Sequence, residues 1–263
     1  MVALRMLLLV AVVLVSGGIV VAETTETGFL NRSVILDGVE YPYQTYVPRE
    51  YKRSVSWPII LALHGAGERG SDGLLQTEVG LGSAIRRYAD RYPALVVFPQ
   101  SPADGTWQGL GARVALAALD KAMAEFNVNA SRVYLTGLSM GGNGSWYLAF
   151  HHSDRFAALV VVCGWTSERR GASGASYPAI APASVPDSFA PVAQRVSRIP
   201  IWIFHGDADP RVPVEESRRM ASALKAIGAD VQYTELPGVG HNSWDPAYAM
   251  AELPMWMFKQ HRQ

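Results

Sequence analysis

The chain has 263 residues, of which 49% are hydrophobic and 17% charged, so it is long enough to bury one sizeable core and too apolar to be disordered. Lysine plus arginine and aspartate plus glutamate both number 23, and no long basic run occurs, which excludes an electrostatic site for nucleic acid. The one cysteine, Cys163, excludes an intramolecular disulfide, and we expect it to be a buried thiol at the end of an apolar run.

The N-terminal residues have the three regions of a secretory signal peptide. Arg5 supplies a positive charge, residues 6–15 are apolar without interruption, and residues 20–22 (VVA) have the small-residue pattern of a cleavage site. We therefore expect residues 1–22 to be removed and residues 23–263 to form one domain that is secreted or periplasmic. The alternative is an uncleaved membrane anchor, because the apolar stretch barely reaches the ~17 residues that a spanning helix needs.

Short apolar runs alternate with helical patterns along the rest of the chain. The predicted strands cover residues 33–36, 44–47, 58–63, 94–98, 132–138, 156–162, 199–204 and 231–236. The predicted helices cover residues 83–92, 111–126, 140–150, 214–227 and 246–259, and residues 171–186 form a predicted loop rich in Gly, Ala, Ser and Pro. Strand followed by helix, repeated, predicts an α/β fold with a mostly parallel eight-stranded sheet flanked by helices. In such sheets, functional groups gather at the carboxyl ends of the strands.

Residues 137–141 read GLSMG and lie between a predicted strand and a predicted helix. This is the G-x-S-x-G pattern in its strand–turn–helix setting, where the glycines permit a tight turn and the serine oxygen projects above the sheet. The N–H groups at the start of the following helix favour negative charge beside that oxygen. We predict that Ser139 is a nucleophile. The alternative is a glycine-rich turn with a surface serine.

A serine hydroxyl needs a base to act as a nucleophile near neutral pH. Among the six histidines, His241 lies in a glycine-rich loop, PGVGHN, after the last predicted strand. That is where the chain order Ser…Asp/Glu…His places the base. His151, His152 and His261 lie at a helix end or in the tail and are weaker candidates. The alternative for His241 is a loop histidine that caps the next helix.

The third member of such a triad should orient the imidazole and lie between Ser139 and His241 in the chain. The loop HGDADPRVP, which follows the predicted strand 199–204, offers Asp207 and Asp209. We predict Asp209, because it lies farther into the loop and has room to reach a neighbouring loop. Asp207 is then expected to hold its own loop by an Asx-type hydrogen bond.

A tetrahedral intermediate needs two N–H donors for its negative oxygen. We predict the backbone N–H groups of Met140, the residue after the nucleophile, and of Ala66, in the loop HGAGERG that follows the strand 58–63. A phosphate-binding loop is excluded because no lysine-serine or lysine-threonine pair follows. The sequence also lacks histidines at metal-ligand spacing and a dinucleotide fingerprint, so we expect no metal and no cofactor.

Three tryptophans follow predicted strands at the catalytic edge of the sheet, and we predict that they line the substrate pocket: Trp107, Trp165 and Trp244. An aromatic wall there would hold an acyl or phenolic group. The alternative for each is packing within its loop. The other four fall inside or beside predicted elements and are expected in the core: Trp57, Trp146, Trp202 and Trp256.

Four segments together resemble the α/β-hydrolase superfamily: LHGAGERG at 63–70, GLSMGGNGSW at 137–146, HGDADPRVP at 205–213 and GVGHNSWDPAY at 238–248. Within it, the chain is similar to the secreted carboxylesterases grouped with phospholipase/carboxylesterases, polyhydroxybutyrate depolymerases and feruloyl esterases. The resemblance covers about residues 30–260 and implies that the domain at 23–263 is an α/β-hydrolase catalytic domain.

Carried over position by position, the resemblance implies that Ser139 is the nucleophile, Asp209 the acid and His241 the base, with Ala66 and Met140 as oxyanion donors. It implies a serine esterase that works through an acyl-enzyme on a small-molecule or polysaccharide-linked ester.

Rival functions stay open at this point. A serine peptidase of the same fold is disfavoured, because such peptidases often select peptides with a large lid or propeller and residues 163–198 are too few to form one. A catalytically silent binding protein would lack a triad member, and none is lacking. Acyl transfer needs a site that excludes water, and dehalogenation normally uses a carboxylate where Ser139 stands. The sequence leaves open the acyl and alcohol parts of the substrate and the oligomeric state, and we expect membrane contact only if residues 1–22 stay uncleaved.

Overall fold

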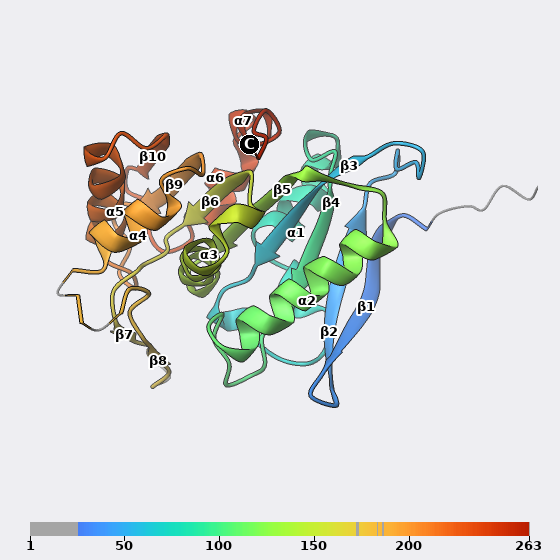
Figure 1. The fold of residues 1–263 in the computed structure, drawn as a ribbon, viewed down its shortest axis with the longest axis horizontal. Coiled ribbons are helices and arrows are strands. Elements are labelled where there is room, and N and C mark those ends of the chain that lie inside the picture. Colours follow the sequence, from blue (N-terminus) through green and yellow to red (C-terminus); the bar gives the residue numbers. More distant parts are fainter. Residues whose placement is uncertain (1–25, 172–173, 183, 186, 263) are drawn as a thin grey trace, which may run out of the picture.

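The computed structural model describes residues 26–171, 174–182, 184–185 and 187–262. The predicted signal peptide, residues 1–22, lies outside these residues. Eight strands form one sheet in the spatial order β1-β2-β4-β3-β5-β6-β9-β10 (Figure 1). Their bounds are β1 Gly28–Leu36, β2 Val39–Val47, β3 Trp57–Leu63, β4 Leu95–Pro99, β5 Val128–Leu138, β6 Ala158–Val162, β9 Ile201–Gly206 and β10 Val231–Leu236.

The eight-stranded sheet is mostly parallel. The pairs β1–β2 and β2–β4 are antiparallel, whereas every neighbouring pair from β4 to β10 is parallel. A separate short hairpin pairs β7 (Arg169–Arg170) with β8 (Ser176–Tyr177). The mostly parallel eight-stranded sheet that the sequence predicts is therefore confirmed.

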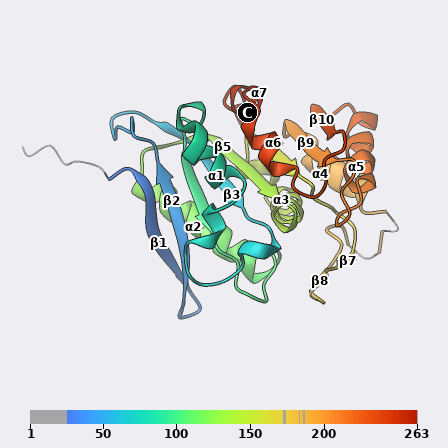
Figure 2. The same cartoon turned by 180° about the vertical axis from the view of Figure 1, so that it is seen from behind.

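Helices cover both faces of this sheet, as the opposite views in Figures 1 and 2 show. The helices α2, α3, α4 and α5 pack on one face, and α1, α6 and α7 pack on the other. Their bounds are α1 Leu81–Tyr88, α2 Leu110–Glu125, α3 Met140–His151, α4 Phe189–Val196, α5 Glu215–Ala226, α6 Trp244–Ala249 and α7 Glu252–Met257. Within the described part of the chain, none of the helices combines the length and the apolar character needed to span a bilayer.

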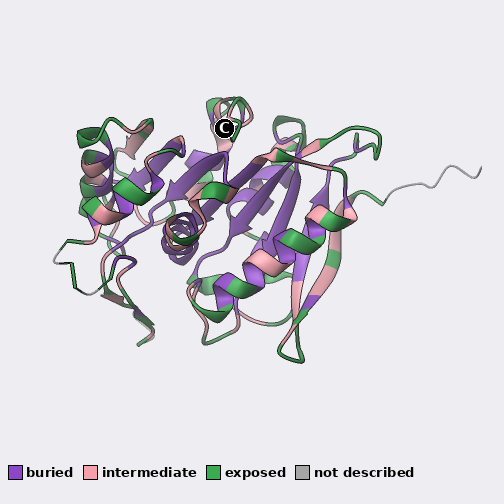
Figure 3. Cartoon of the chain, in the orientation of Figure 1, coloured by how far each residue is buried: buried purple, intermediate pink, exposed green. Residues whose placement is uncertain are grey.

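The strands β4, β6 and β9 are buried along their whole length, and β3 is buried from its second residue onward (Figure 3). In β3, Ile59 and Leu61 join the core on the side of α2, while Ile60 and Ala62 join the core on the side of α1. A strand that is covered on both faces is apolar at every position, which explains the uninterrupted run PIILAL. This packing fixes the strand ends from which the site is built.

Two predictions about the later elements need correction. The predicted terminal helix 246–259 is two helices, because Met250 adopts an extended conformation between α6 and α7. Pro254 is the expected site of a kink, and the break lies where its ring acts: in a continuous helix the ring would clash with the carbonyl of Met250, four residues earlier, whereas in the first turn of α7 the missing N–H costs nothing. The predicted loop 171–186 contains the strand β8, and the unpredicted helix α4 follows it.

Candidate active site

Ser139 stands on the turn between β5 and α3 with a positive φ of 52°, a conformation that costs energy for a residue with a side chain. Its neighbours explain why the turn needs glycine. A Cβ on Gly137 would lie 2.1 Å from the carbonyl oxygen of Gly141, and a Cβ on Gly141 would lie 2.0 Å from that of Leu63. The motif GLSMG therefore permits the close approach of three backbone segments and lifts the serine oxygen out of the sheet.

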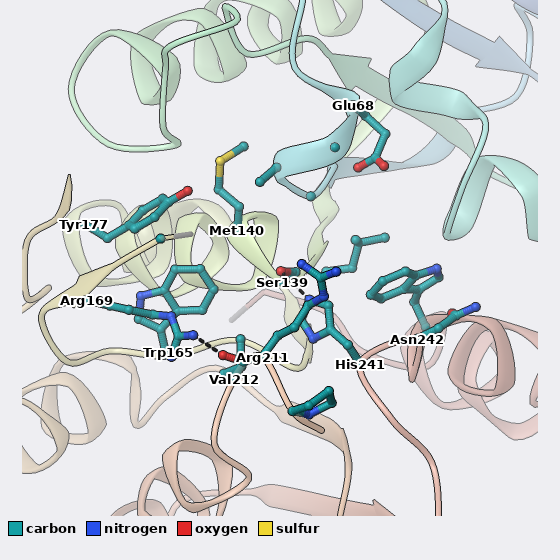
Figure 4. Close-up of a pocket in the computed structure, with 17 residues that line it drawn as sticks. Glu68, Ser139, Met140, Trp165, Arg169, Tyr177, Arg211, Val212, His241 and Asn242 are labelled. Atoms are coloured by element: carbon teal, nitrogen blue, oxygen red, sulfur yellow. Dashed lines mark hydrogen bonds between the residues drawn. The ribbon is translucent and has the colours of Figure 1, made fainter. Parts of the chain in front are cut away.

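The side chains of Ser139, His241 and Asp209 form one hydrogen-bonded chain. Ser139 Oγ lies 2.9 Å from His241 Nε2 (Figure 4), and Asp209 Oδ2 lies 2.7 Å from His241 Nδ1. The side chain of Asp209 is fully buried, whereas that of His241 is 16% exposed. Because the carboxylate accepts the proton of Nδ1, Nε2 is left with its lone pair toward the serine hydroxyl. The structure thus brings together all three residues of the predicted triad.

The Asp209 carboxylate accepts more hydrogen bonds than the one from His241. Its Oδ1 accepts from the backbone N–H groups of Arg211 at 2.7 Å and Val212 at 3.0 Å. Its Oδ2 also lies 3.2 Å from Nε2 of the buried His205. Burial alone would raise the pKa of Asp209, but the hydrogen bonds from His205, His241 and the backbone outweigh it and hold that pKa well below its ordinary value. The carboxylate is therefore a fixed negative charge beneath the imidazole.

His205 supports the carboxylate with a defined tautomer. Its Nε2 lies 3.1 Å from the carbonyl oxygen of Val212 as well as close to Asp209, so this nitrogen must carry the proton. Its Nδ1 lies 2.7 Å from Ser217 Oγ and accepts the hydroxyl proton. Sequence reasoning quoted His205 in its motif but missed this role, for which the only clue was its place at the end of a buried strand.

Asp207 holds a different contact from the one expected. Its Oδ1 accepts from the backbone N–H of Gly238 at 2.6 Å, which ties the loop after β9 to the loop after β10. Asp209 has the Asx-type pattern instead, because its side chain accepts from the backbone N–H groups two and three residues later in the chain. Asp207 is exposed and does not contact His241 in the described structure.

Ala66 and Met140 both line the pocket beside Ser139. Each is the first residue of a helix, where the N–H has no acceptor within the helix, and neither N–H bonds a described residue outside it, so both donors are available to a ligand. His64 holds the loop that carries Ala66 through two contacts. Its Nδ1 lies 2.6 Å from the Gly65 carbonyl oxygen, and its Nε2 accepts from the Ser101 N–H at 3.0 Å. Burial lowers the pKa of His64 to about 4, so it stays neutral at physiological pH.

The pocket has a volume of about 660 Å³ and places two of the three predicted tryptophans on its walls. Trp165 lies on one side, and Trp244 packs perpendicular to the His241 ring at 5.4 Å. Trp107 does not line it: the side chain is fully buried, and its Nε1 donates to the His64 carbonyl at 2.9 Å. The prediction for Trp107 is corrected, because it supports the loop of Ala66 from within the core.

Cys163 is buried next to the triad. Its Sγ lies 3.6 Å from the His241 carbonyl oxygen and belongs, with Asp209 and His241, to a group of potential ligand atoms within 4.8 Å of one another. Burial raises the pKa of the thiol to about 12, which disfavours the thiolate that binds metals, and the histidine and carboxylate atoms already bond each other. These residues fit a packed thiol better than a metal site, and the absence of a metal stays a prediction.

Four further residues of the pocket wall were not predicted from the sequence. They are Glu68, Arg169, Tyr177 and Arg211, and Figure 4 shows them around Ser139. Two of them lie in the motifs HGAGERG and HGDADPRVP, which was the available sequence clue. The other two come from the hairpin β7–β8, whose position depends on contacts that no local pattern encodes.

The sequence profile of the prolyl oligopeptidase family matches residues 105–257, more than half of the chain, and that range contains Ser139, Asp209 and His241. The chain belongs to the prolyl oligopeptidase family. This membership agrees with the α/β-hydrolase fold that the four motifs imply and that the sheet displays.

Two curated relatives of this family member are distant and longer than this chain. An uncharacterized secreted protein of Arthroderma benhamiae is 27% identical over 72% of this chain and 22% of its own length. Acetylxylan esterase A of Emericella nidulans is 26% identical over 64% of this chain and 60% of its own length. The chain thus spans less than two thirds of either relative.

Solved structures share the fold. A thermostable esterase is 33% identical, with a TM-score of 0.73 over 89% of this chain and 63% of that protein. A ferulic acid esterase is 15% identical, with a TM-score of 0.69 over 89% of this chain and 99% of that protein, and this second likeness shows the fold alone.

Proposed function

We propose that this protein is a secreted serine hydrolase that cleaves carboxylic esters, with Ser139 as nucleophile, His241 as base and Asp209 as the orienting acid. The observation that carries the proposal is the continuous hydrogen-bonded chain from Asp209 through His241 to Ser139 at the floor of a 660 Å³ pocket. Nucleophile, base and orienting group within hydrogen-bond reach of one another are the arrangement that activates a serine.

The geometry supports a two-stage reaction. Ser139 Oγ attacks the ester carbonyl carbon while its proton passes to His241 Nε2, which lies 2.9 Å away. The carbon–oxygen bond of the ester then breaks, and the alcohol leaves with the proton from His241. Water attacks the acyl-enzyme in the same way, gives a proton to His241, and releases the carboxylic acid and free Ser139.

The negative oxygen of each tetrahedral intermediate lies, in this proposal, against the N–H groups of Ala66 and Met140. Both donors line the pocket with Ser139, and both lack another partner among the described residues. Met140 is also the first residue of α3, so the positive end of the helix dipole adds to its donor.

A peptide bond is the second candidate substrate, and the family name favours it. The observations that favour an ester are the acetylxylan esterase among the relatives and the thermostable esterase at 33% identity. The connection between β6 and β9 is also short, and its described residues form only the hairpin β7–β8 and the helix α4. These support a site for a compact ester rather than one built to enclose a peptide.

Matched substrates test the ester proposal. The protein should hydrolyse 4-nitrophenyl acetate and leave 4-nitroacetanilide, which has the same acyl and aryl groups, nearly intact. One equivalent of a fluorophosphonate should abolish hydrolysis and map to Ser139, and a chelator should have no effect. Faster cleavage of the anilide would identify a peptidase, and a label on another serine would overturn the triad. Longer nitrophenyl esters, methyl ferulate and acetylated xylan then define the acyl and alcohol parts.

Export is the second part of the proposal. It is supported by the charged, apolar and small-residue regions before Glu23, and one relative is described as a secreted protein. Amino-terminal sequencing of the protein recovered outside the cytoplasm should begin at or near Glu23. An intact Met1 in the membrane fraction would contradict cleavage and support an anchor.

A further inference from the structure

Two arginines line the same side of the pocket. Arg169, in β7, is half-buried, and its guanidinium carbon lies 5.4 Å from the centre of the Trp165 ring. Its guanidinium also donates to the backbone carbonyl of Arg211, as Figure 4 shows. Arg211 follows Asp209 in the loop after β9, and its own side chain extends over the pocket near Ser139 (Figure 4). The Arg169 side chain thus has contacts on two sides, with the Trp165 ring and with the Arg211 carbonyl.

No carboxylate of the described residues pairs with either guanidinium. The ion pairs within 4.0 Å involve other arginines, among them Arg218, which contacts both Glu215 and Glu235. Each guanidinium therefore carries a positive charge that no described carboxylate neutralises, and a pocket wall screens such a charge less than bulk water does. An anionic group of a ligand would supply the missing counter-charge and would accept charge-assisted hydrogen bonds from a guanidinium.

The opposite wall carries the only acidic side chain among the described lining residues. Glu68 belongs to the loop after β3, whereas Arg169 and Arg211 follow β6 and β9, and the sheet places β3 and β9 on opposite sides of β5, which carries Ser139. Glu68 Oε2 is buried, and burial raises the pKa of the carboxyl although the backbone N–H groups of Gly65 and Glu68 act in the opposite direction. The acidic side chain and Arg169 therefore lie on opposite sides of Ser139.

Between these ends the wall is aromatic. Trp165 is almost completely buried, and Tyr177 packs against it at 5.1 Å with the two rings perpendicular. The Trp165 position is fixed further by its carbonyl, which accepts from Asn143 Nδ2 at 3.0 Å. Such a rigid surface suits a flat or extended apolar group between the ester carbonyl and Arg169.

We infer that the pocket selects esters that carry a negatively charged group beyond the scissile bond, and that Arg169 and Arg211 bind that group. The inference rests on the proposed ester hydrolysis, which supplies the reaction. The charged group lies on the side of β7, away from Glu68, with the apolar part of the substrate against Trp165 and Tyr177. Arg169 and Arg211 thereby determine specificity without taking part in the chemical step.

Two pairs of esters, each matched in shape, test the inference. Monoethyl terephthalate is compared with its neutral primary amide, which places the charge on the acyl part. The acetate esters of 4-hydroxybenzoate and of 4-hydroxybenzamide place it on the alcohol part. For at least one pair, kcat/KM of the wild-type protein should be about tenfold higher for the anion, the gain expected of a partly exposed charge-assisted bond.

Arginine variants test whether Arg169 and Arg211 cause the preference for the anionic ester. Arg169→Gln should bring the anion-to-amide ratio close to one, Arg211→Gln should reduce it, and Arg169→Lys should keep part of it. Arg170→Gln is the matched control, because Arg170 is the next residue of β7, is exposed and does not line the pocket. Its ratio should equal that of the wild type. The ratio is internal to each variant, so a general loss of folded protein does not affect it.

The outcomes separate this inference from the proposed function. If the protein cleaves esters but the anion-to-amide ratio of kcat/KM is near one in both pairs, the anionic subsite is wrong and the proposed ester hydrolysis stands. The subsite is also wrong if Arg170→Gln lowers this ratio as much as Arg169→Gln does. If no ester is cleaved and no fluorophosphonate label is taken up, the proposed function fails, and the subsite fails with it.

Discussion

Replacing Ser139 with alanine is expected to lower kcat by about 10⁶-fold, to the level that binding and oxyanion donors alone support. The variant has no oxygen to attack the ester carbonyl, and His241 then has no proton to take. Fluorophosphonate labelling should disappear as well. Steady-state hydrolysis of 4-nitrophenyl acetate, with a sensitive end-point assay for the variant, measures the loss.

The fold should tolerate this change. Alanine keeps the Cβ, so the backbone at φ 52° is no more and no less strained than in the native protein. The hydroxyl makes one hydrogen bond, to His241, at the edge of an open pocket, so the thermal transition should move by only a few degrees. Undiminished hydrolysis by a folded Ser139→Ala protein would mean that another residue is the nucleophile.

The central strands could be predicted because they are covered on both faces. In β3, every position from Pro58 to Leu63 is buried. The segment therefore has no polar residue and is recognised as a strand and not as a loop. The strand ends followed from these runs, and the chain order of the loops after them predicted which residues would meet. This chain order alone predicts that Ser139, Asp209 and His241 lie together.

Other parts of the site depend on contacts between segments that are distant in the chain. The order of residues predicts that Trp107 follows a strand, but not that its indole points inward to the His64 carbonyl. Likewise, Arg169 and Tyr177 reach the pocket because the hairpin β7–β8 packs beside the loop after β9. Such orientations are set by tertiary packing and have no local signature in the residues themselves.

Asp209→Asn should lower kcat on the order of 10⁴-fold while leaving the protein folded, as loss of the orienting carboxylate does in a serine triad. In the native protein Oδ2 faces two ring N–H donors, His241 Nδ1 and His205 Nε2. An asparagine that turns its oxygen toward the backbone donors of Arg211 and Val212 presents an amide N–H to both histidines. His241 then accepts a hydrogen bond at Nδ1 and carries its ring proton on Nε2. This tautomer has no lone pair to take the proton of Ser139.

Asp207→Asn is the matched control for this variant. It removes the same charge two residues away, and its oxygen can still accept the 2.6 Å bond from the Gly238 N–H. Activity should therefore change little. If Asp207→Asn proved the more damaging change, the orienting acid would have been assigned to the wrong aspartate.

The difference in unfolding free energy between the wild type and Asp209→Asn should be smaller at acid pH than at pH 7. Hydrogen bonds hold the pKa of Asp209 below its value in an unfolded chain, about 3.9, so the ionised carboxylate stabilises the fold fully above that pH. As the pH falls below about 4 toward the lower pKa of the folded state, protonation removes this contribution progressively. Urea unfolding at pH 7 and pH 3 should show a larger gap in unfolding free energy at pH 7. A gap that is independent of pH would mean that the charge of Asp209 does not stabilise the fold, and that asparagine destabilises it only by mismatching the donors of His205 and His241.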